Sequence, residues 1–406
     1  MPLSSGQLSF SEIQGEFGGS NPISLSEYYK TGAYVPNISL TSTIPTSSTI
    51  SVGNFRSTSS SPTVNGFSST GDTGQDFLML GGAVSPSGVF IAVGGASSGA
   101  RGPGYATSSD GINWSGVSIV PGMVSDQFST FYDVACRSDG LFVAVGAGNN
   151  NSLGIFSQSG GGAFNGAQVI SGGAPINTLY SIGVSSSGLF VAGSFGGRMF
   201  YSSDGYNWAQ GPSNSNGSSN CFIQGIVCRS DGRWVGVGGN GSNRPAYSYS
   251  NDGVNWSTIT NMVDIGVAIS MKSVAVSPKT GRFVAVGSYF GRYPFVAASD
   301  DGINWAYNWG FHDYGDLNAV RCNRAGVFVA AAGGRINTTP GYWISSTDGL
   351  NWTSPADILP WSGTWAQFRG LAVNNYVGTS GYGRFAPVGA GYRGDFSSYT
   401  IFGQQS

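Results

Sequence analysis

The chain has 406 residues, of which 66 are glycine and only 9% are charged, and its formal net charge is −2. A chain of this length suits one large domain with a small accessory segment. It contains no basic run, which argues against nucleic acid as a partner, and no apolar stretch of the roughly 18 residues that a membrane helix needs. Its first residues lack the basic segment and apolar run of a secretory signal.

Residues 1–60 do not share the repeat that follows, and they predict a small N-terminal docking segment. Residues 9–17 and 22–29 predict short helices, and residues 35–55 are rich in serine and threonine and predict extended chain. Such a segment cannot bury much core alone, so the alternatives are a flexible leader and a module that docks on a partner. Its spaced apolar residues favour docking. The expected contact residues are Phe10, Ile13, Phe17, Tyr28 and Tyr29.

Residues 61–406 repeat a unit of about fifty residues, which is typical of a propeller or a solenoid. Each unit predicts four strands, and the second strand reads Gly-x-Phe-Val-Ala-Val-Gly or a close variant. Its aromatic residue occurs seven times, which predicts an all-β, seven-bladed β-propeller. These aromatic residues are Phe90, Phe142, Phe190, Trp234, Phe283, Phe328 and Phe385.

Between the third and fourth strands stands a second phrase, Ser-x-Asp-Gly-x-Asn-Trp, in five copies. Asp-Gly suits a tight turn with positive φ, and the aspartate can accept hydrogen bonds from the following amides. The tryptophan is expected to pack between blades as an apolar anchor. The phrase is lost at residues 157–164, where Phe164 replaces the tryptophan. We therefore assign a structural role to Asp110, Asp204, Asp252, Asp301 and Asp348, and to Trp114, Trp208, Trp256, Trp305 and Trp352.

The seventh unit ends too soon, because only three residues follow its third strand near residues 397–403. The segment 63–67 resembles the start of a fourth strand as found at residues 112–114. We expect a strand near residues 62–68 to close the ring as the outer strand of the last blade. Closure of this kind removes open sheet edges.

Three of the four cysteines occupy one position of the repeat, six residues before the strand aromatic, where the first and third units have Val84 and Val184. A position that alternates between cysteine and valine is a buried apolar position. Cys136, Cys228 and Cys322 would lie in different blades and are expected to be reduced structural thiols. The same interpretation is extended to Cys221, although its place in the repeat has no explanation.

The N-terminal segment also carries a resemblance. Residues 8–29, with Gly32-Ala33-Tyr34-Val35-Pro36 and the run 44–51, resemble a leader found on virion appendage proteins of tailed bacteriophages, including cyanophages. In that family the leader precedes varied C-terminal modules on tails, baseplates, fibres or necks. The resemblance implies a virion structural protein, located in the virion, that contacts other virion proteins through residues 1–60.

The Asp-Gly phrase is similar to the Asp-box of sialidases and related propellers, although it is one residue shorter between aspartate and tryptophan. In that group the box is a fold element far from any active site. The resemblance implies only a structural role for the five aspartates.

The sequence argues against an enzyme. Glycoside hydrolysis usually needs two positioned carboxylates, yet the repeat region has no glutamate, and most of its aspartates lie singly. His312 is the only histidine, so a catalytic triad or a histidine-based zinc site has little support. No phosphate-binding glycine loop occurs, and one acid per box is too few for calcium. We expect no catalytic residues, no cofactor and no metal.

The candidate binding surface is the rim that carries the loops between second and third strands. Arginine forks bind carboxylates and phosphates, and exposed tyrosine and tryptophan stack on sugar faces. The alternative is that each arginine anchors its own loop. The candidate ligand-binding residues are Arg101, Arg198, Arg244, Arg292, Arg335, Arg393, Tyr289, Tyr293 and Trp309, the last of them in the connection after the fifth blade.

Together these features predict a bacteriophage virion protein whose propeller recognises a host surface polysaccharide without cleaving it. We expect a homo-oligomer in the virion, no nucleic-acid partner and no membrane insertion. The alternative is a purely architectural decoration protein that contacts only other virion proteins. A glycan-cleaving propeller is a third hypothesis, and it would need two aspartates about 5 to 9 Å apart in the rim.

Overall fold

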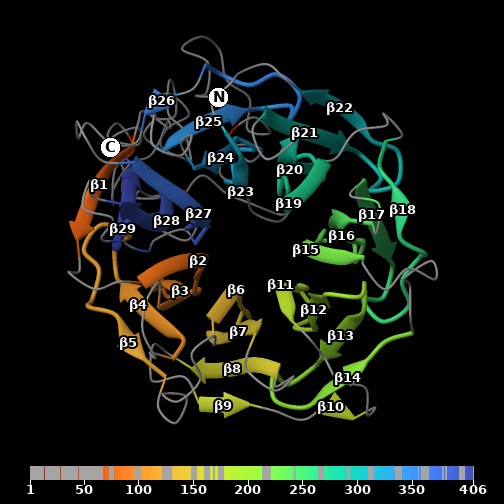
Figure 1. Ribbon diagram of the computed structural model, residues 1–406, viewed down its shortest axis with the longest axis horizontal. Helices are drawn as coiled ribbons and strands as arrows, with labels where there is room; N and C mark the ends of the chain where they lie inside the picture. Colours follow the sequence, from red (N-terminus) through yellow and green to blue (C-terminus); the bar gives the residue numbers. More distant parts are fainter. Residues whose placement is uncertain are drawn as a thin grey trace.

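The computed structural model describes residues 13, 28, 44, 67–72, 77–96, 102–120, 130–147, 153–159, 165–167, 170–171, 178–212, 221–240, 242, 244–263, 269–289, 293–309, 315–333, 341–354, 356–357, 365–376, 379, 382–392 and 398–405. These residues form seven sheets around a common axis, each with one strand at the centre and its others further out (Figure 1). The protein is therefore an all-β propeller, as the repeat predicts. No helix in this described part is long and apolar enough to cross a membrane.

Each sheet is a blade, named below by its strands. The first three are β2 (Phe77–Val84), β3 (Phe90–Ala96), β4 (Gly104–Ser108) and β5 (Ser118–Ile119); β6 (Thr130–Cys136), β7 (Leu141–Ala147), β8 (Leu153–Ser159) and β9 (Asn165–Ala167); and β11 (Leu179–Val184), β12 (Phe190–Ser194), β13 (Met199–Ser202) and β14 (Trp208–Gln210), with β10 (Ile170–Ser171) parallel to β14.

The next three blades follow the same order from the axis outward. They are β15 (Phe222–Cys228), β16 (Trp234–Gly239), β17 (Pro245–Ser250) and β18 (Thr260–Asn261); β19 (Ile269–Val276), β20 (Phe283–Tyr289), β21 (Tyr293–Ser299) and β22 (Ala306–Trp309); and β23 (Leu317–Cys322), β24 (Phe328–Ala332), β25 (Tyr342–Ser346) and β26 (Ala356–Asp357).

The remaining sheet contains both early and late parts of the chain. Its inner strands are β27 (Trp365–Val373), β28 (Phe385–Tyr392) and β29 (Ser398–Gln405), and its outer strand is β1 (Phe67–Asp72). β1 pairs antiparallel with β29, and Phe67 lies opposite Gln405. The strand that completes this sheet thus begins where the segment 63–67 ends.

The aromatic residue of the repeat is the first residue of the second strand in six blades and the second residue of β7 in the other. All seven of these side chains are at most 2% exposed. In three blades the ring lies near the tryptophan of the same blade, with centroids 6.4 Å apart for Phe90 and Trp114 and 6.5 Å apart for Trp234 and Trp256. The aromatic residues of the repeat therefore form the core of the blades.

The five box turns share one hydrogen-bond pattern. In the blade β15–β18, Asp252 Oδ1 accepts hydrogen bonds from the backbone amides of Val254 and Asn255, both at 2.8 Å, while Oδ2 accepts one from the Asn255 side chain. Ser250 donates its hydroxyl to the same carboxylate at 2.9 Å. Gly253 has a φ of 77°, which explains the glycine. These hydrogen bonds hold the residues of the turn together.

These hydrogen bonds also set the acidity of the box aspartates. Burial alone would raise their pKa values, but the donated amide and hydroxyl bonds outweigh it and lower the pKa of Asp110, Asp252 and Asp348 from 3.8 to about 2. The pKa values of Asp204 and Asp301 are lowered as well, for the same reason.

Replacing Asp252 by alanine is expected to lower the free energy of unfolding by about 1–2 kcal/mol, because two backbone amides lose their acceptor. Because the folded pKa lies below the unfolded value of 3.8, the box contribution is complete above that value and is lost as pH falls toward about 2. Calorimetric melting at neutral and acid pH measures both effects. Asp252→Asn keeps an acceptor and is the control; equal losses in the two variants would contradict the hydrogen-bond account.

Every innermost strand has a bulge at the same place. The register shifts by one residue after Met79, Phe131, Leu179, Ile223, Met271, Leu317 and Phe368. The residue that follows the bulge packs against the next innermost strand and is usually small. A Cβ at Gly81 would lie 2.7 Å from the backbone of Asp133, and one at Gly370 would lie 2.7 Å from the backbone of Leu80. The bulges thus space the central strands and turn one extra side chain per blade toward the axis.

Two arginines in turns between first and second strands fasten neighbouring blades together. Arg229 forms an ion pair with Asp231 at 2.8 Å, and its guanidinium lies 5.0 Å from the ring of Phe283 in the next blade. It also donates a hydrogen bond to the carbonyl of Asp300 at 2.6 Å. Arg137 makes the same contacts, with Asp139 and with the next blade.

The fourth strands differ from the sequence expectation, because most of them begin after the Asn-Trp pair. Trp114 makes one bridge to Ser108, and β5 starts only at Ser118. The reason is that the box turn itself uses the residues from the serine to the tryptophan.

The four cysteines are free thiols, and burial raises the pKa values of Cys136, Cys228 and Cys322 to about 12.

Candidate functional site

The structure places part of the predicted docking set. Ile13 and Tyr28 are fully buried. Phe10, Phe17 and Tyr29 lie outside the described residues. The docking role stays a prediction.

The predicted aromatic residues lie together in the blade β19–β22. Tyr289 ends β20 and Tyr293 begins β21, and their ring centroids are 6.0 Å apart. The Trp309 ring stands edge-on to that of Tyr289 at 5.1 Å. Trp309 lies in β22 rather than in the following connection, because its strand pairs it with Phe295. We call these three residues, with Tyr307, the aromatic cluster.

The cluster presents aromatic surface to solvent. Trp309 is 46% exposed and Tyr307 41%, whereas most large apolar side chains in the described part are buried. Tyr307 stacks on Phe295 with an interplanar angle of 17°, so one face of its ring is supported from below. A rigid, supported and exposed ring of this kind can stack on the apolar face of a sugar.

Two of the predicted arginines fall in the described part. Arg198 and Arg244 lie in the turns between second and third strands, as expected, and the Arg244 backbone amide donates to Asn240 Oδ1 at 2.9 Å. Both are half-buried. Arg101, Arg292, Arg335 and Arg393 lie outside the described residues. Whether the arginines bind a ligand stays a prediction.

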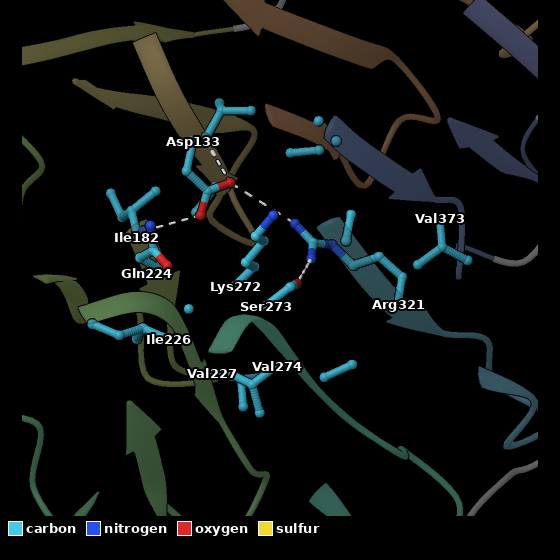
Figure 2. A pocket seen from close by; sticks show the side chains of 18 of the residues that line it. Asp133, Ile182, Gln224, Ile226, Val227, Lys272, Ser273, Val274, Arg321 and Val373 are labelled. Carbon is cyan, nitrogen blue, oxygen red and sulfur yellow. Dashed lines mark hydrogen bonds and ion pairs between the residues drawn. The ribbon is translucent and has the colours of Figure 1, made fainter. Parts of the chain in front are cut away.

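Sequence analysis missed a central cavity of about 460 Å³ on the propeller axis. All seven innermost strands line it, and the bulge residues of all seven reach it. Beyond the bulges the walls are largely apolar, with Ile182, Ile226, Val227 and Val274 among them (Figure 2). The bulge residues are Leu80, Tyr132, Tyr180, Gln224, Lys272, Asn318 and Arg369.

An ion pair spans this cavity between blades that are not neighbours. Arg321 on β23 extends toward Asp133 on β6, with Nη2 and Oδ1 3.8 Å apart (Figure 2). The Asp133 carboxylate also accepts hydrogen bonds from the amides of Val134 at 2.9 Å and Ile182 at 3.1 Å. Burial raises the pKa of Asp133, while Arg321 and the two amides oppose that rise.

A second polar group stands at the level of the bulges. Lys272 Nζ donates hydrogen bonds to Asp316 Oδ2 at 2.5 Å and to Asn318 Oδ1 at 3.0 Å. Burial lowers the pKa of Lys272 and Arg369 lowers it further, while Asp316 raises it. Lys272 and Arg369 are therefore close enough to repel each other.

Acidic groups are few in the described lining of the cavity. Its lining contains one carboxylate among the described residues, Asp133, which already pairs with Arg321. Within the described part of the chain no three histidine, cysteine, aspartate or glutamate residues are grouped to hold a metal ion. The sequence contains one trace of this cavity. Each unit has a position that follows an apolar residue and precedes a usually small one, and the residue type at that position changes from unit to unit.

Comparison with known proteins adds information on the fold. No family model matches the sequence, and a search of curated proteins gave no match. The chain is similar to the structure of YCF48 bound to D1 peptide, with a TM-score of 0.56 and 13% sequence identity over 85% of this chain and 96% of that chain. It is also similar to the Dos1 propeller, with a TM-score of 0.48 and 10% identity over 80% of this chain and 83% of that chain. At such identities the likeness to YCF48 shows that the chain has a β-propeller fold.

Proposed function

We propose that this protein is a virion appendage protein of a tailed bacteriophage and that its propeller binds a host surface glycan without cleaving it. The resemblance of residues 8–51 to an appendage leader supports the virion assignment. The seven sheets and the pairing of β1 with β29 support a complete ring of seven blades preceded by that leader. Many copies per particle would strengthen a weak interaction at each propeller.

The observation that carries the glycan assignment is the aromatic cluster. Its four rings come from three strands of one blade, and Trp309 and Tyr307 keep more than two fifths of their surface exposed. Aromatic rings left exposed in this way are typical of recognition sites. Because sugar rings carry apolar C–H faces, the cluster suits a saccharide and would hold it without covalent chemistry.

The full-length protein, labelled with a fluorophore, should bind some members of an array of bacterial surface polysaccharides in a saturable way. Trp309→Ala is expected to weaken that binding about tenfold or more, as loss of a central aromatic contact does. The matched control is Tyr206→Ala, because Tyr206 is 47% exposed but lies in a box turn. Equal affinities in both variants would mean that the glycan binds away from the aromatic cluster, and no binding to any polysaccharide would favour the architectural role instead.

A further inference from the structure

The ring of bulge residues has two unlike halves. The blades follow one another around the axis in chain order (Figure 1). In that order the ring runs through an apolar and aromatic arc and then through a polar arc. The first arc consists of Leu80, Tyr132 and Tyr180, and the second of Gln224, Lys272, Asn318 and Arg369. A ligand on the axis would therefore meet rings on one side and hydrogen-bond donors and positive charge on the other.

Among the described residues that line the cavity, the basic side chains outnumber the acidic ones. Lys272, Arg321 and Arg369 line it, whereas Asp133 is the only acid among the described residues that do so. Asp133 pairs with Arg321, and Asp316 pairs with Lys272 from outside the lining. A partly screened site of this composition favours an anionic group, and guanidinium matches a carboxylate with two parallel hydrogen bonds.

The amides of the polar arc have fixed orientations. Asn318 donates its side-chain NH₂ to the carbonyl of Phe368 at 2.8 Å, so its oxygen faces Lys272. Gln224 Oε1 accepts a hydrogen bond from the Ser270 hydroxyl at 3.0 Å. The Gln224 NH₂ is thereby turned away from Ser270 and can donate to a ligand hydroxyl.

The opposite arc offers aromatic surface. The rings of Tyr132 and Tyr180 are 5.4 Å apart and tilted by 59°, and both side chains are half-buried. Burial raises the pKa values of both phenols, so their hydroxyl groups stay neutral. The rings can contact the C–H face of a sugar while the hydroxyl groups remain donors and acceptors.

We propose that the central cavity is a second binding site and takes a carboxylated sugar ring, of the uronic acid type, from an acidic glycan. The carboxylate would lie toward Arg369 and Lys272, the hydroxyl groups toward Gln224, and an apolar face on Tyr132 and Tyr180. A volume of about 460 Å³ accommodates a group of this size. The choice of a sugar rests on the proposed glycan-binding function, whereas the site itself is separate from the aromatic cluster.

The test uses glucuronate as the probe, with glucose and inorganic phosphate as comparison ligands, in ligand-observed NMR titrations of the full-length protein. Glucuronate is expected to bind more tightly than either comparison ligand. Arg369→Gln should weaken glucuronate about tenfold and leave glucose unchanged, because one charge-assisted contact is lost. Arg233→Gln is the charge-matched control, since the Arg233 guanidinium lies over the Tyr249 ring in β17, away from the axis.

A second variant keeps the test informative if Arg369→Gln does not fold. Tyr180→Leu should weaken glucuronate and leave phosphate unchanged, because it removes ring surface and no charge. Equal titrations of Arg369→Gln and Arg233→Gln would overturn the proposal. So would phosphate binding as tightly as glucuronate, which would mean an anion site without sugar recognition.

The aromatic cluster serves as the separating control. Trp309→Ala should bind glucuronate like the unmodified protein, because its ring lies in the outermost strand of the blade. Loss of glucuronate binding in that variant would place the sugar at the cluster and overturn the proposal for the cavity. Glucuronate binding that depends on Arg369, in a protein that binds no polysaccharide on the array, would support the cavity site and refute the cluster.

Discussion

Replacing Phe283 by alanine is expected to lower the free energy of unfolding by about 4 kcal/mol. The side chain is fully buried and packs with Val235 of the preceding blade and Ala297 of its own. The guanidinium of Arg229 lies over its ring, so truncation also removes a cation–π contact between two blades. The variant would thus lose core packing within its blade and a fastening between blades.

Urea denaturation followed by tryptophan fluorescence measures the loss as a lower midpoint. Phe283→Leu fills most of the volume and should cost about 1 kcal/mol, which makes it the matched control. Phe328 is also buried at the start of its second strand, so Phe328→Ala should behave like Phe283→Ala, less the arginine contribution. A midpoint unchanged by Phe283→Ala would contradict the assignment of this residue to the blade core.

Replacing Arg321 by methionine is expected to destabilise the protein by about 2 kcal/mol at neutral pH, because the Asp133 carboxylate loses its counter-charge. The figure is below that for a fully buried pair, since the two side chains keep 27% and 18% of their surface exposed. Burial holds the folded pKa of Asp133 above its unfolded value. Protonation of Asp133 then favours the folded state. The loss of stability caused by Arg321→Met should therefore shrink as the pH falls through the folded pKa of Asp133 toward 3.8, and it should be larger at pH values above that pKa.

Thermal melts of the Arg321→Met variant and the unmodified protein, taken from pH 7 down to pH 4, would show this convergence. The double variant Arg321→Met/Asp133→Asn removes both charges and is the control. It should be more stable than the single variant at neutral pH, although the introduced carboxamide has one acceptor oxygen and would give up one of the two amide hydrogen bonds. A difference that stays constant with pH would mean that Arg321 acts through packing and not through its charge.

The blades could be predicted because their signals are local and repeated. The box turn needs a serine, an aspartate and a glycine within four residues, and its hydrogen bonds close within the turn, as at Ser250–Gly253. The strand aromatics recur at the start of every second strand for one reason, burial between neighbouring blades. A pattern that each unit must satisfy separately is visible in a single sequence.

The central cavity could not be found in this way. Its bulge residues occupy one repeat position, yet that position holds leucine, tyrosine, glutamine, lysine, asparagine and arginine in different units. The ring is assembled from seven distant segments, and Arg321 and Asp133 pair across 188 residues of sequence, the difference between their residue numbers. Side-chain contacts that form only when the ring closes leave no local pattern in the sequence.

The arginines illustrate a second limit. Sequence analysis singled out arginines in the loops between second and third strands as ligand-binding candidates. The structure shows that Arg137 and Arg229, in the turns on the other rim, bind the backbone of the next blade. Such contacts depend on how two blades are placed side by side. The sequence of either blade alone does not contain that information.

The pairing of β1 with β29 has a mechanical consequence. The chain before Phe67 reaches the propeller through β1, which hydrogen-bonds to the last strand and then continues into the first blade at β2. If the N-terminal segment docks and the propeller binds a ligand, as proposed above, tension between the two passes through this strand pair. The backbone bonds from Phe67–Gln405 to Asp72–Ile401 resist that tension before β2 does. The seam of the ring would then also be the point at which force enters it, and the pairing of β1 with β29 would bear that force first.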